Sequence, residues 1–172
     1  MTRLVEDQHI RKRCFAPVVD DRTRLLVLGS LPGDRSLARQ EYYGNAQNCF
    51  WKLIFDVIGL DQVPIDYASR LQALLATGVG LWDVVAEADR EGSLDHRIRR
   101  QAGNDLIGLI GRLPCLAAIA FNGGIAARLG LRALGEHAAR YQIVRLPSSS
   151  PAYTLAYAEK LTAWRTLREY LL

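Results

Sequence analysis

The sequence contains no long apolar run. Its 172 residues are 49% apolar and 23% charged, which is usual for a soluble globular protein. No stretch approaches the roughly 18 apolar residues that a membrane-spanning helix needs. The polar beginning, MTRLVEDQHIRKR, does not resemble a secretory signal peptide. We therefore predict a protein without membrane segments that works in the cytoplasm.

Cysteine and histidine are scarce and scattered. The cysteines Cys14, Cys49 and Cys115 form no CxxC pair, and their odd number leaves one unpaired in any disulfide scheme. We expect three free thiols in a reducing compartment. A four-thiolate iron–sulfur cluster would need another cysteine, and the three histidines lack the spacing of metal ligands. The sequence thus predicts neither a metal nor another cofactor.

Lysine is rare among the basic residues, which comprise 19 arginines and three lysines. The net charge of +4 and the isoelectric point near 9.1 indicate a mild basic excess. Such an excess permits nucleic-acid binding without requiring it. Arginine forks suit phosphates, but the same skew can follow from the base composition of a genome. Charge alone therefore does not identify a partner.

Short apolar runs alternate with amphipathic stretches along the chain. The predicted strands are residues 24–28, 79–82, 116–121 and 141–146. The predicted helices are residues 48–58, 67–77, 105–111, 124–131 and 154–171. This order is typical of a parallel sheet covered on both faces. We expect an α/β fold, a three-layer α/β/α sandwich around a four-stranded parallel sheet. One domain would span residues 1–172, with residues 1–22 as a peripheral N-terminal segment.

Four loops follow the predicted strands at the edge where open parallel sheets bind ligands. They are GSLPGDRS (29–36), DVVAEADREGSLD (83–95), NGG (122–124) and PSSSPAY (147–153). The small residues of GSLPGDRS let backbone N–H groups approach a phosphate or base closely. This loop lacks GxGxxG and GxxxxGK[ST], so a dinucleotide site or P-loop is weakly supported. A plain strand–turn–helix connection is an equal alternative.

The loop PSSSPAY places three hydroxyls between prolines, which suits it to bind phosphate oxygens. Its serines belong to no GxSxG or SxxK motif, so nothing marks a nucleophile. The alternative interpretation is a helix N-cap with two spare serines.

Two further loops each offer one polar side chain directly after a strand. Asn122 of NGG can hydrogen-bond the edge of a heterocycle, although asparagine before glycines is equally natural in a turn. Asp83 of GLWDVV can bind or activate a ligand, although aspartate also commonly caps helices. Both alternatives stay open at this point.

The stretch EYYGNAQNCFW (41–51) concentrates aromatic rings and neutral amides. Tyr43 is the ring nearest the GSLPGDRS loop and is suited to stack on a flat ligand. Phe50 and Trp51 lie in an amphipathic pattern, which predicts that they belong to the core. Asn48 is either the N-cap of a helix or a functional amide directed at the crevice.

Together these blocks resemble the uracil-DNA glycosylase superfamily, and most closely its hypoxanthine-DNA (deoxyinosine) glycosylase branch, often called family six. The matching blocks are LVLGSLPGDRSL…YYGNAQNCFWKLI, GVGLWDVV…REGSLD, AFNGG and LPSSSPAY. They occur in the expected order across most of residues 24–155. Each block is weak by itself, whereas four in order form a specific signal.

The resemblance implies an enzyme that flips a deaminated base, hypoxanthine or uracil, out of DNA. It would hydrolyse the N-glycosidic bond and so start base-excision repair. Because the four loops contain no lysine that could form a Schiff base with the sugar, we expect a monofunctional glycosylase. Many superfamily members carry a catalytic Asn or Asp where Leu31 stands here. In the deoxyinosine branch this role is associated with the asparagine of a YYGHPRNxFW-like stretch, which corresponds to Asn48. The sequence departs there, because GHPRN has become GNAQN and Asn45 replaces the histidine.

The resemblance also assigns the surrounding residues. Asn48 is the expected catalytic residue, and Tyr43, Asn122, Asn45, Leu31 and Asp83 are expected in the base pocket. The expected contacts to the DNA backbone and to the gap in the duplex are Gly29, Ser30, Pro32, Gly33, Pro147, Ser148, Ser149 and Ser150. The expected partner is double- or single-stranded DNA that contains a damaged base, bound by a monomer.

Two other functions remain open. One is a protein that binds DNA lesions with little or no turnover, since Leu31 and the GNAQN loop depart from the common pattern. The other is a hydrolase of free nucleosides or nucleotides. The sequence also leaves open which base is removed, because hypoxanthine, uracil, xanthine and mispaired thymine are similar flat rings.

Overall fold

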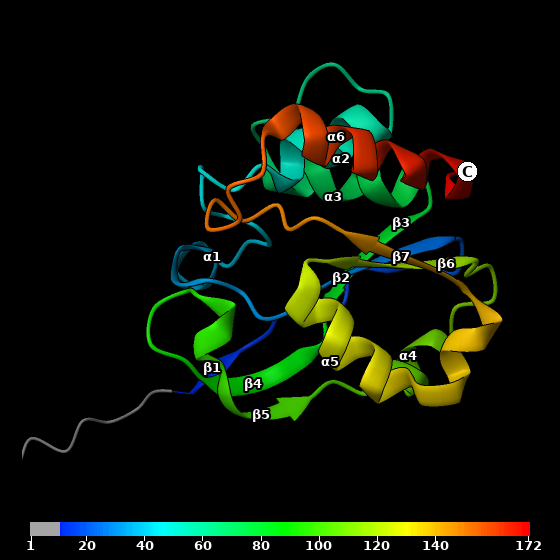
Figure 1. Cartoon of the computed structure of the whole chain (residues 1–172). Coiled ribbons are helices and arrows are strands. Elements are labelled where there is room, and N and C mark those ends of the chain that lie inside the picture. The colour runs from blue at the N-terminus through cyan, green and yellow to red at the C-terminus, as the bar shows by residue number, and fades with distance from the viewer. Residues whose placement is uncertain (1–10) are drawn as a thin grey trace, which may run out of the picture.

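A parallel sheet of four strands forms the centre of the computed structural model, which describes residues 11–172 (Figure 1). Its strands are β2 (Leu25–Gly29), β3 (Val79–Asp83), β6 (Ala118–Asn122) and β7 (Gln142–Leu146). They lie in the order β3-β2-β6-β7, and every neighbouring pair is parallel. The predicted α/β/α fold and its four strands are confirmed, with boundaries that differ by at most two residues.

Strand β2 is one of the two inner strands of the sheet. Its side chains alternate between two helical layers, because successive residues of a strand point to opposite faces. Leu25 and Val27 belong to a hydrophobic cluster with one layer, and Leu26 and Leu28 belong to the cluster on the other face. The first layer contains α2 (Phe50–Val57), α3 (Tyr67–Ala76) and α6 (Tyr157–Trp164). The second contains α4 (Leu106–Ile110) and α5 (Gly124–Leu134), on the opposite side of the sheet in Figure 1.

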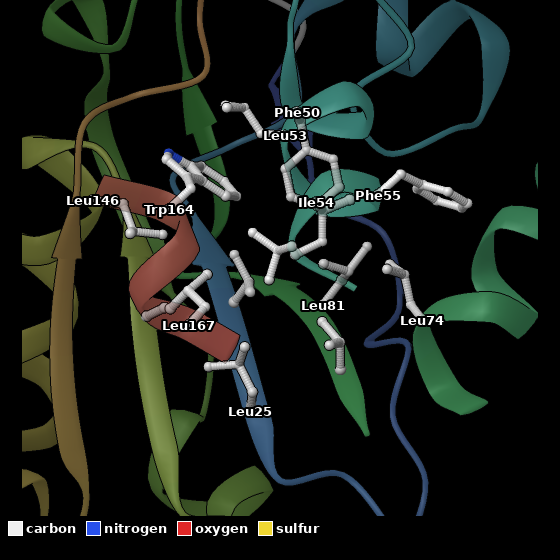
Figure 2. Close-up of a cluster of buried hydrophobic side chains, with 14 of the residues drawn as sticks. Leu25, Phe50, Leu53, Ile54, Phe55, Leu74, Leu81, Leu146, Trp164 and Leu167 are labelled. Carbon is white, nitrogen blue, oxygen red and sulfur yellow. The ribbon is translucent and has the colours of Figure 1, made fainter. Parts of the chain in front are cut away.

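The first cluster is built around large aromatic side chains. Figure 2 shows Phe50 and Trp164 among leucines of the strands and helices. Phe50 and Trp164 are fully buried, and Trp51 is 6% exposed, so the prediction that Phe50 and Trp51 are core residues is confirmed. The indole N–H of Trp164 donates to the backbone oxygen of Pro147 at 3.0 Å. A core side chain thereby satisfies a polar group at the start of the serine loop, our name for residues 147–153.

Four of the five predicted helices are confirmed to within three residues at each end, but the last prediction was wrong in extent. Instead of one helix over residues 154–171, α6 ends at Trp164 and a 3₁₀-helix, η3 (Arg165–Tyr170), follows. Arg168 in η3 donates to the backbone oxygens of Asp56 and Val57 at the end of α2. These contacts with another helix are tertiary, so the periodicity of the sequence did not reveal the tighter turn.

A second, antiparallel sheet was not predicted. Strand β4 (Val85–Asp89) lies between β1 (Lys12–Arg13) and β5 (Arg99–Gly103). The sequence predicts a loop over residues 83–95, since VAEAD contains no apolar run that would indicate a strand. Ion pairs between strands, such as Arg13 with Glu87 at 3.1 Å, accompany the pairing.

Three short helices were also missed, namely α1 (Asp34–Arg39), η1 (Asp95–Arg97) and η2 (Gly135–Arg140). The expectation of free thiols is confirmed for Cys14, Cys49 and Cys115. Among residues 11–172, no helix is both long enough and apolar enough to cross a membrane.

Replacing Gly130 by alanine is expected to lower the free energy of unfolding by about 1–3 kcal/mol. A Cβ at this position of α5 would lie 2.2 Å from Cε1 of Phe121, a buried ring of β6. This crowding outweighs the roughly 1 kcal/mol that alanine gains over glycine inside a helix. Urea denaturation of both proteins measures the difference.

Gly124→Ala is the matched control in the same helix. A Cβ on Gly124 meets no atom within 4 Å, so this variant should be at least as stable as the original protein. Equal stability of the Gly130 and Gly124 variants would contradict the packing described here.

Candidate active site

A cavity of about 520 Å³ opens at the carboxyl edge of the parallel sheet, where loops after β2, β3, β6 and β7 meet. It gathers 13 of the 14 site residues predicted from the sequence. These are Gly29, Ser30, Leu31, Pro32, Gly33, Tyr43, Asn45, Asn48, Asp83, Asn122, Ser148, Ser149 and Ser150. Pro147 does not line the cavity, and its backbone oxygen accepts the hydrogen bond from Trp164.

Asn122 and Ser149 form a buried pair that joins the end of β6 to the serine loop. Asn122 Nδ2 donates to Ser149 Oγ at 2.8 Å, and the backbone N–H of Ser149 donates to Asn122 Oδ1 at 2.9 Å. Their exposed fractions are 7% and 1%. The structure therefore uses the Asn122 amide to position the loop. That Asn122 hydrogen-bonds the edge of a base stays a prediction. For this contact Asn122 would use the second amide hydrogen or the second oxygen lone pair, which its bonds with Ser149 do not occupy.

The hydroxyl oxygens of Ser148 and Ser150 accept hydrogen bonds from within their own loop. Ser148 Oγ accepts from the backbone N–H of Ser150 at 3.1 Å, and Ser150 Oγ accepts from that of Ala152 at 3.2 Å. Each hydroxyl still has its own O–H group to donate. Both residues line the cavity, so the loop offers two hydroxyl donors to an anionic ligand.

Arg90, which no sequence motif marks as functional, holds the loop after β2. Its side chain has no exposed surface. The guanidinium donates to the backbone oxygens of Leu31 and Pro32 and to that of Gly92. An arginine within REGS gives no local sign of burial, so nothing in the sequence could have identified this role. Leu31 itself is buried in a small apolar cluster.

Asp83, at the end of β3, presents an unusual buried carboxyl group. The residue is 4% exposed, and its Oδ2 atom has no hydrogen-bond partner among the described residues. Burial, together with the nearby charge of Asp95, raises the pKa of Asp83 to about 7, while Arg90 opposes the rise. Near neutral pH this group therefore exchanges readily between its charged and neutral forms.

Gly29 is required beside this carboxyl group. A Cβ on Gly29 would lie 2.6 Å from Asp83 Oδ1 and 2.8 Å from the hydroxyl oxygen of Tyr43. Both side chains thus approach the same point of the backbone, and any larger residue would displace them. The loop after β2 therefore needs glycine at position 29 to leave room for these two side chains, in addition to offering backbone N–H donors.

Tyr43 lies with one ring face against the core. Its ring stacks on Phe50 with the centroids 3.8 Å apart and the planes 18° apart. Its backbone has a φ of 53°, in the left-handed region that is uncommon for residues other than glycine. A base in the cavity can meet only the opposite face or the hydroxyl end of this ring.

Asn48 is not the N-cap of α2, which is Cys49, so that alternative was wrong, and its functional role stays a prediction. Its Oδ1 atom accepts from the backbone N–H of Phe50, two residues on, at 3.0 Å, as in an Asx-turn. The residue also lines the cavity, and its Nδ2 group can donate to a ligand there. Asn45 supports the adjacent turn, since its Oδ1 accepts from Gln47 N and from Arg35 Nη1.

Metal ligands do not gather in the described part of the chain. No group of three or more His, Cys, Asp or Glu side chains among residues 11–172 is arranged to hold an ion. The side chains that line the cavity carry carboxyl, amide, hydroxyl and aromatic groups, together with the imidazole of His96 and the guanidinium of Arg35.

The sequence of this chain is similar to that of a known protein family and to the sequences of two individual proteins. The sequence signature of the uracil DNA glycosylase superfamily matches residues 16–171. A hypoxanthine DNA glycosylase of Methanosarcina barkeri is 38% identical over 157 residues, which cover 90% of this chain and 96% of that protein. A hypoxanthine DNA glycosylase of Methanosarcina acetivorans is 39% identical over 158 residues, or 91% and 97% of the two chains.

A solved structure has the same fold. It is a solution NMR structure of a Methanosarcina acetivorans protein provisionally described as a uracil DNA glycosylase. It superposes with a TM-score of 0.80 at 38% identity and covers 92% of this chain and 97% of its own.

Asp83→Asn is expected to change how stability depends on pH. The folded state raises the pKa of Asp83 from 3.8 to about 7, so it binds this proton more tightly than the unfolded state does. The original protein should lose stability as the pH rises from about 4 to about 8, by up to about 4 kcal/mol from this group. Asparagine does not ionise and avoids that loss.

Urea denaturation between pH 4 and pH 8 compares the two proteins. They should be about equally stable near pH 4, and the Asn variant should be increasingly more stable toward pH 8. Parallel curves over the whole range would show that Asp83 is not buried as described.

Proposed function

The chain belongs to the uracil DNA glycosylase superfamily, and we propose on this premise that it is a monofunctional DNA glycosylase. It hydrolyses the N-glycosidic bond of a deaminated base, hypoxanthine or uracil, and so starts base-excision repair. The observation that carries the proposal is the cavity that residues of all four strand-end loops line together. Its volume lies within the about 300–1,000 Å³ usual for small-ligand sites.

A stacked base cannot enter this cavity, so the enzyme flips the nucleotide out of the DNA. The free face or the hydroxyl end of Tyr43 contacts the base. Asp83 lines this cavity, and its carboxyl group accepts a hydrogen bond from a ring N–H of hypoxanthine or uracil. Adenine and cytosine carry a lone pair at the corresponding ring nitrogen, and an ionised Asp83 would repel it. A carboxylate acceptor in the cavity would thus favour deaminated bases.

Asn48 is the proposed catalytic residue. One lone pair of its Oδ1 is occupied by the backbone N–H of Phe50, and the other can accept a hydrogen bond from the attacking water. Its Nδ2 group can donate to the departing base, which leaves with negative charge. An amide does not take up a proton, so Asn48 acts by orientation and electrostatic stabilisation of a sugar cation-like state.

Monofunctional chemistry is supported by the positions of the lysines. No lysine lines the cavity in the part of the chain that the structure describes, so no amine is placed to form a Schiff base with the sugar. The proposed product is an intact abasic site. We further propose that a single domain over residues 1–172 acts as a cytoplasmic monomer on double- or single-stranded DNA.

A panel of oligonucleotides, each with one lesion, tests this function. Duplexes and single strands carrying hypoxanthine, uracil, xanthine or mispaired thymine are incubated with the protein and then treated with alkali. Alkali-dependent cleavage at hypoxanthine or uracil is expected, without a covalent adduct after borohydride treatment. Binding without cleavage would favour a lesion-binding protein, and strong competition by free nucleosides would favour a nucleoside hydrolase.

Asn48→Ala is expected to lower the single-turnover excision rate by ~10²–10³, because about 2.7–4 kcal/mol of transition-state stabilisation is lost with an oriented polar group. The same change should cost about 1 kcal/mol of stability, because the bond to Phe50 N is also lost. Single-turnover kinetics and thermal melting are measured on the same samples.

Two controls separate catalysis from support of the turn. Asn48→Ser keeps a side-chain oxygen able to accept from the backbone N–H of Phe50, so it should melt close to the original protein and still excise slowly. Asn45→Ala removes a comparable turn contact and should affect excision far less. Near-normal excision by a folded Asn48→Ala protein would refute the assignment.

A further inference from the structure

The proposed reaction needs a proton acceptor, which the amide of Asn48 cannot provide. The water that attacks the sugar must lose a proton as its oxygen bonds to carbon. A general base for that proton has to lie within hydrogen-bond reach of the water, and so in the cavity. Besides an arginine and tyrosines, the ionisable side chains that line the cavity are Asp83, Asp95 and His96.

Asp95, the first residue of η1, is the carboxylate that water in the cavity can reach. Its side chain is 37% exposed. By contrast, Asp83 is 4% exposed as a whole, and its Oδ2 atom is buried. His96 is exposed, and no hydrogen bond among residues 11–172 orients its ring. A base must be both accessible and held in place, so the anchoring of Asp95 is the next requirement.

Arg90 provides this anchor. Its Nη1 atom donates to Asp95 Oδ1 at 3.5 Å and to the backbone oxygen of Leu31 at 3.3 Å. One guanidinium nitrogen thereby joins Asp95 to the loop after β2. The Arg90 side chain has no exposed surface, so it restrains the carboxylate without occupying the cavity. A carboxylate can accept about four hydrogen bonds, which leaves Asp95 with acceptor sites for a water molecule.

The surroundings of Asp95 also suit a proton acceptor. Partial burial raises the pKa of Asp95. Hydrogen bonding by Ser30 and the nearby charges of Arg90 and His96 oppose this rise. A carboxylate whose pKa lies above the ordinary value binds a proton more strongly, and it is therefore a better general base.

We propose that Asp95 is a second catalytic residue, the general base that takes a proton from the attacking water. The water oxygen bonds to C1′ of the sugar while the bond between C1′ and the base nitrogen breaks. The electron pair of that bond leaves with the base, and the proton of the water passes to the carboxylate of Asp95. Asp95 then releases this proton to solvent, from which the base anion takes up a proton. The role rests on the proposed function, because it completes the same hydrolysis.

Asp95→Asn is expected to lower the single-turnover excision rate by about 10²–10⁴, the usual contribution of a general base. Asparagine has a similar size but does not take up the proton. The rate is measured with protein in excess over a duplex that carries hypoxanthine or uracil, and melting is recorded on the same samples. Glu91→Gln is the matched control, since Glu91 is an exposed carboxylate of the same segment that does not line the cavity. Its variant should keep the original rate.

Chemical rescue separates proton transfer from support of Arg90. Asp95→Ala should regain excision as the concentration of formate rises, because formate can accept the proton in the space that the side chain vacates. Chloride at the same concentration can also pair with Arg90, but it is not a base and should restore nothing. Equal effects of formate and chloride would show that Asp95 acts only as a partner of Arg90, and would overturn the proposal.

Asp95→Glu keeps the test decisive if the Asn and Ala variants fold poorly. Glutamate retains a negative charge for Arg90, so this variant should melt close to the original protein. Its longer side chain displaces the carboxylate, and a displacement of about 1 Å can cost about 10²-fold in rate. Near-original excision by a folded Asn or Glu variant would overturn the role of Asp95 and leave the proposed function intact. Failure of the original protein to excise any lesion would overturn both.

Discussion

The hydrogen bonds between Asn122 and Ser149 are the constraint on which the cavity depends. They join the end of β6 to the serine loop, and the backbone oxygen of Ser149 in turn accepts from the backbone N–H of Cys49 at 3.2 Å. That last bond fixes the start of α2, where Asn48 lies. Because the pair is buried, breaking it would leave polar groups without water or partners. Sheet, loop and proposed catalytic amide are therefore held as one unit.

The two sides of the cavity differ in charge. On the side of β3, burial raises the pKa of both Asp83 and Asp95, and Arg90 balances these carboxyl groups while it holds the first loop. On the side of α6, Lys160 is a cation without a carboxylate partner among the described residues, behind neutral serines.

The replacement of the usual Asn or Asp by Leu31 also has a structural explanation. Leu31 packs in an apolar cluster with Val85, Ala88 and Ile98, next to the antiparallel sheet. Its backbone is held by Arg90, so the loop keeps a defined shape without a polar side chain there. Asn48, just before α2, lines the same cavity, which supports the proposal that its amide replaces the polar side chain that Leu31 lacks.

The sequence by itself determined the parallel sheet, its helical layers and the loops that form the cavity. These features depend on local patterns, namely apolar runs, helical periodicity and short motifs at strand ends. Only the tertiary structure decided which polar groups are buried. Nothing local distinguishes Arg90 and Lys160 from exposed basic residues, or Asp83 from a capping carboxylate. Their burial arises because residues distant in the sequence cover them, and the same distant contacts create the antiparallel sheet from short polar strands.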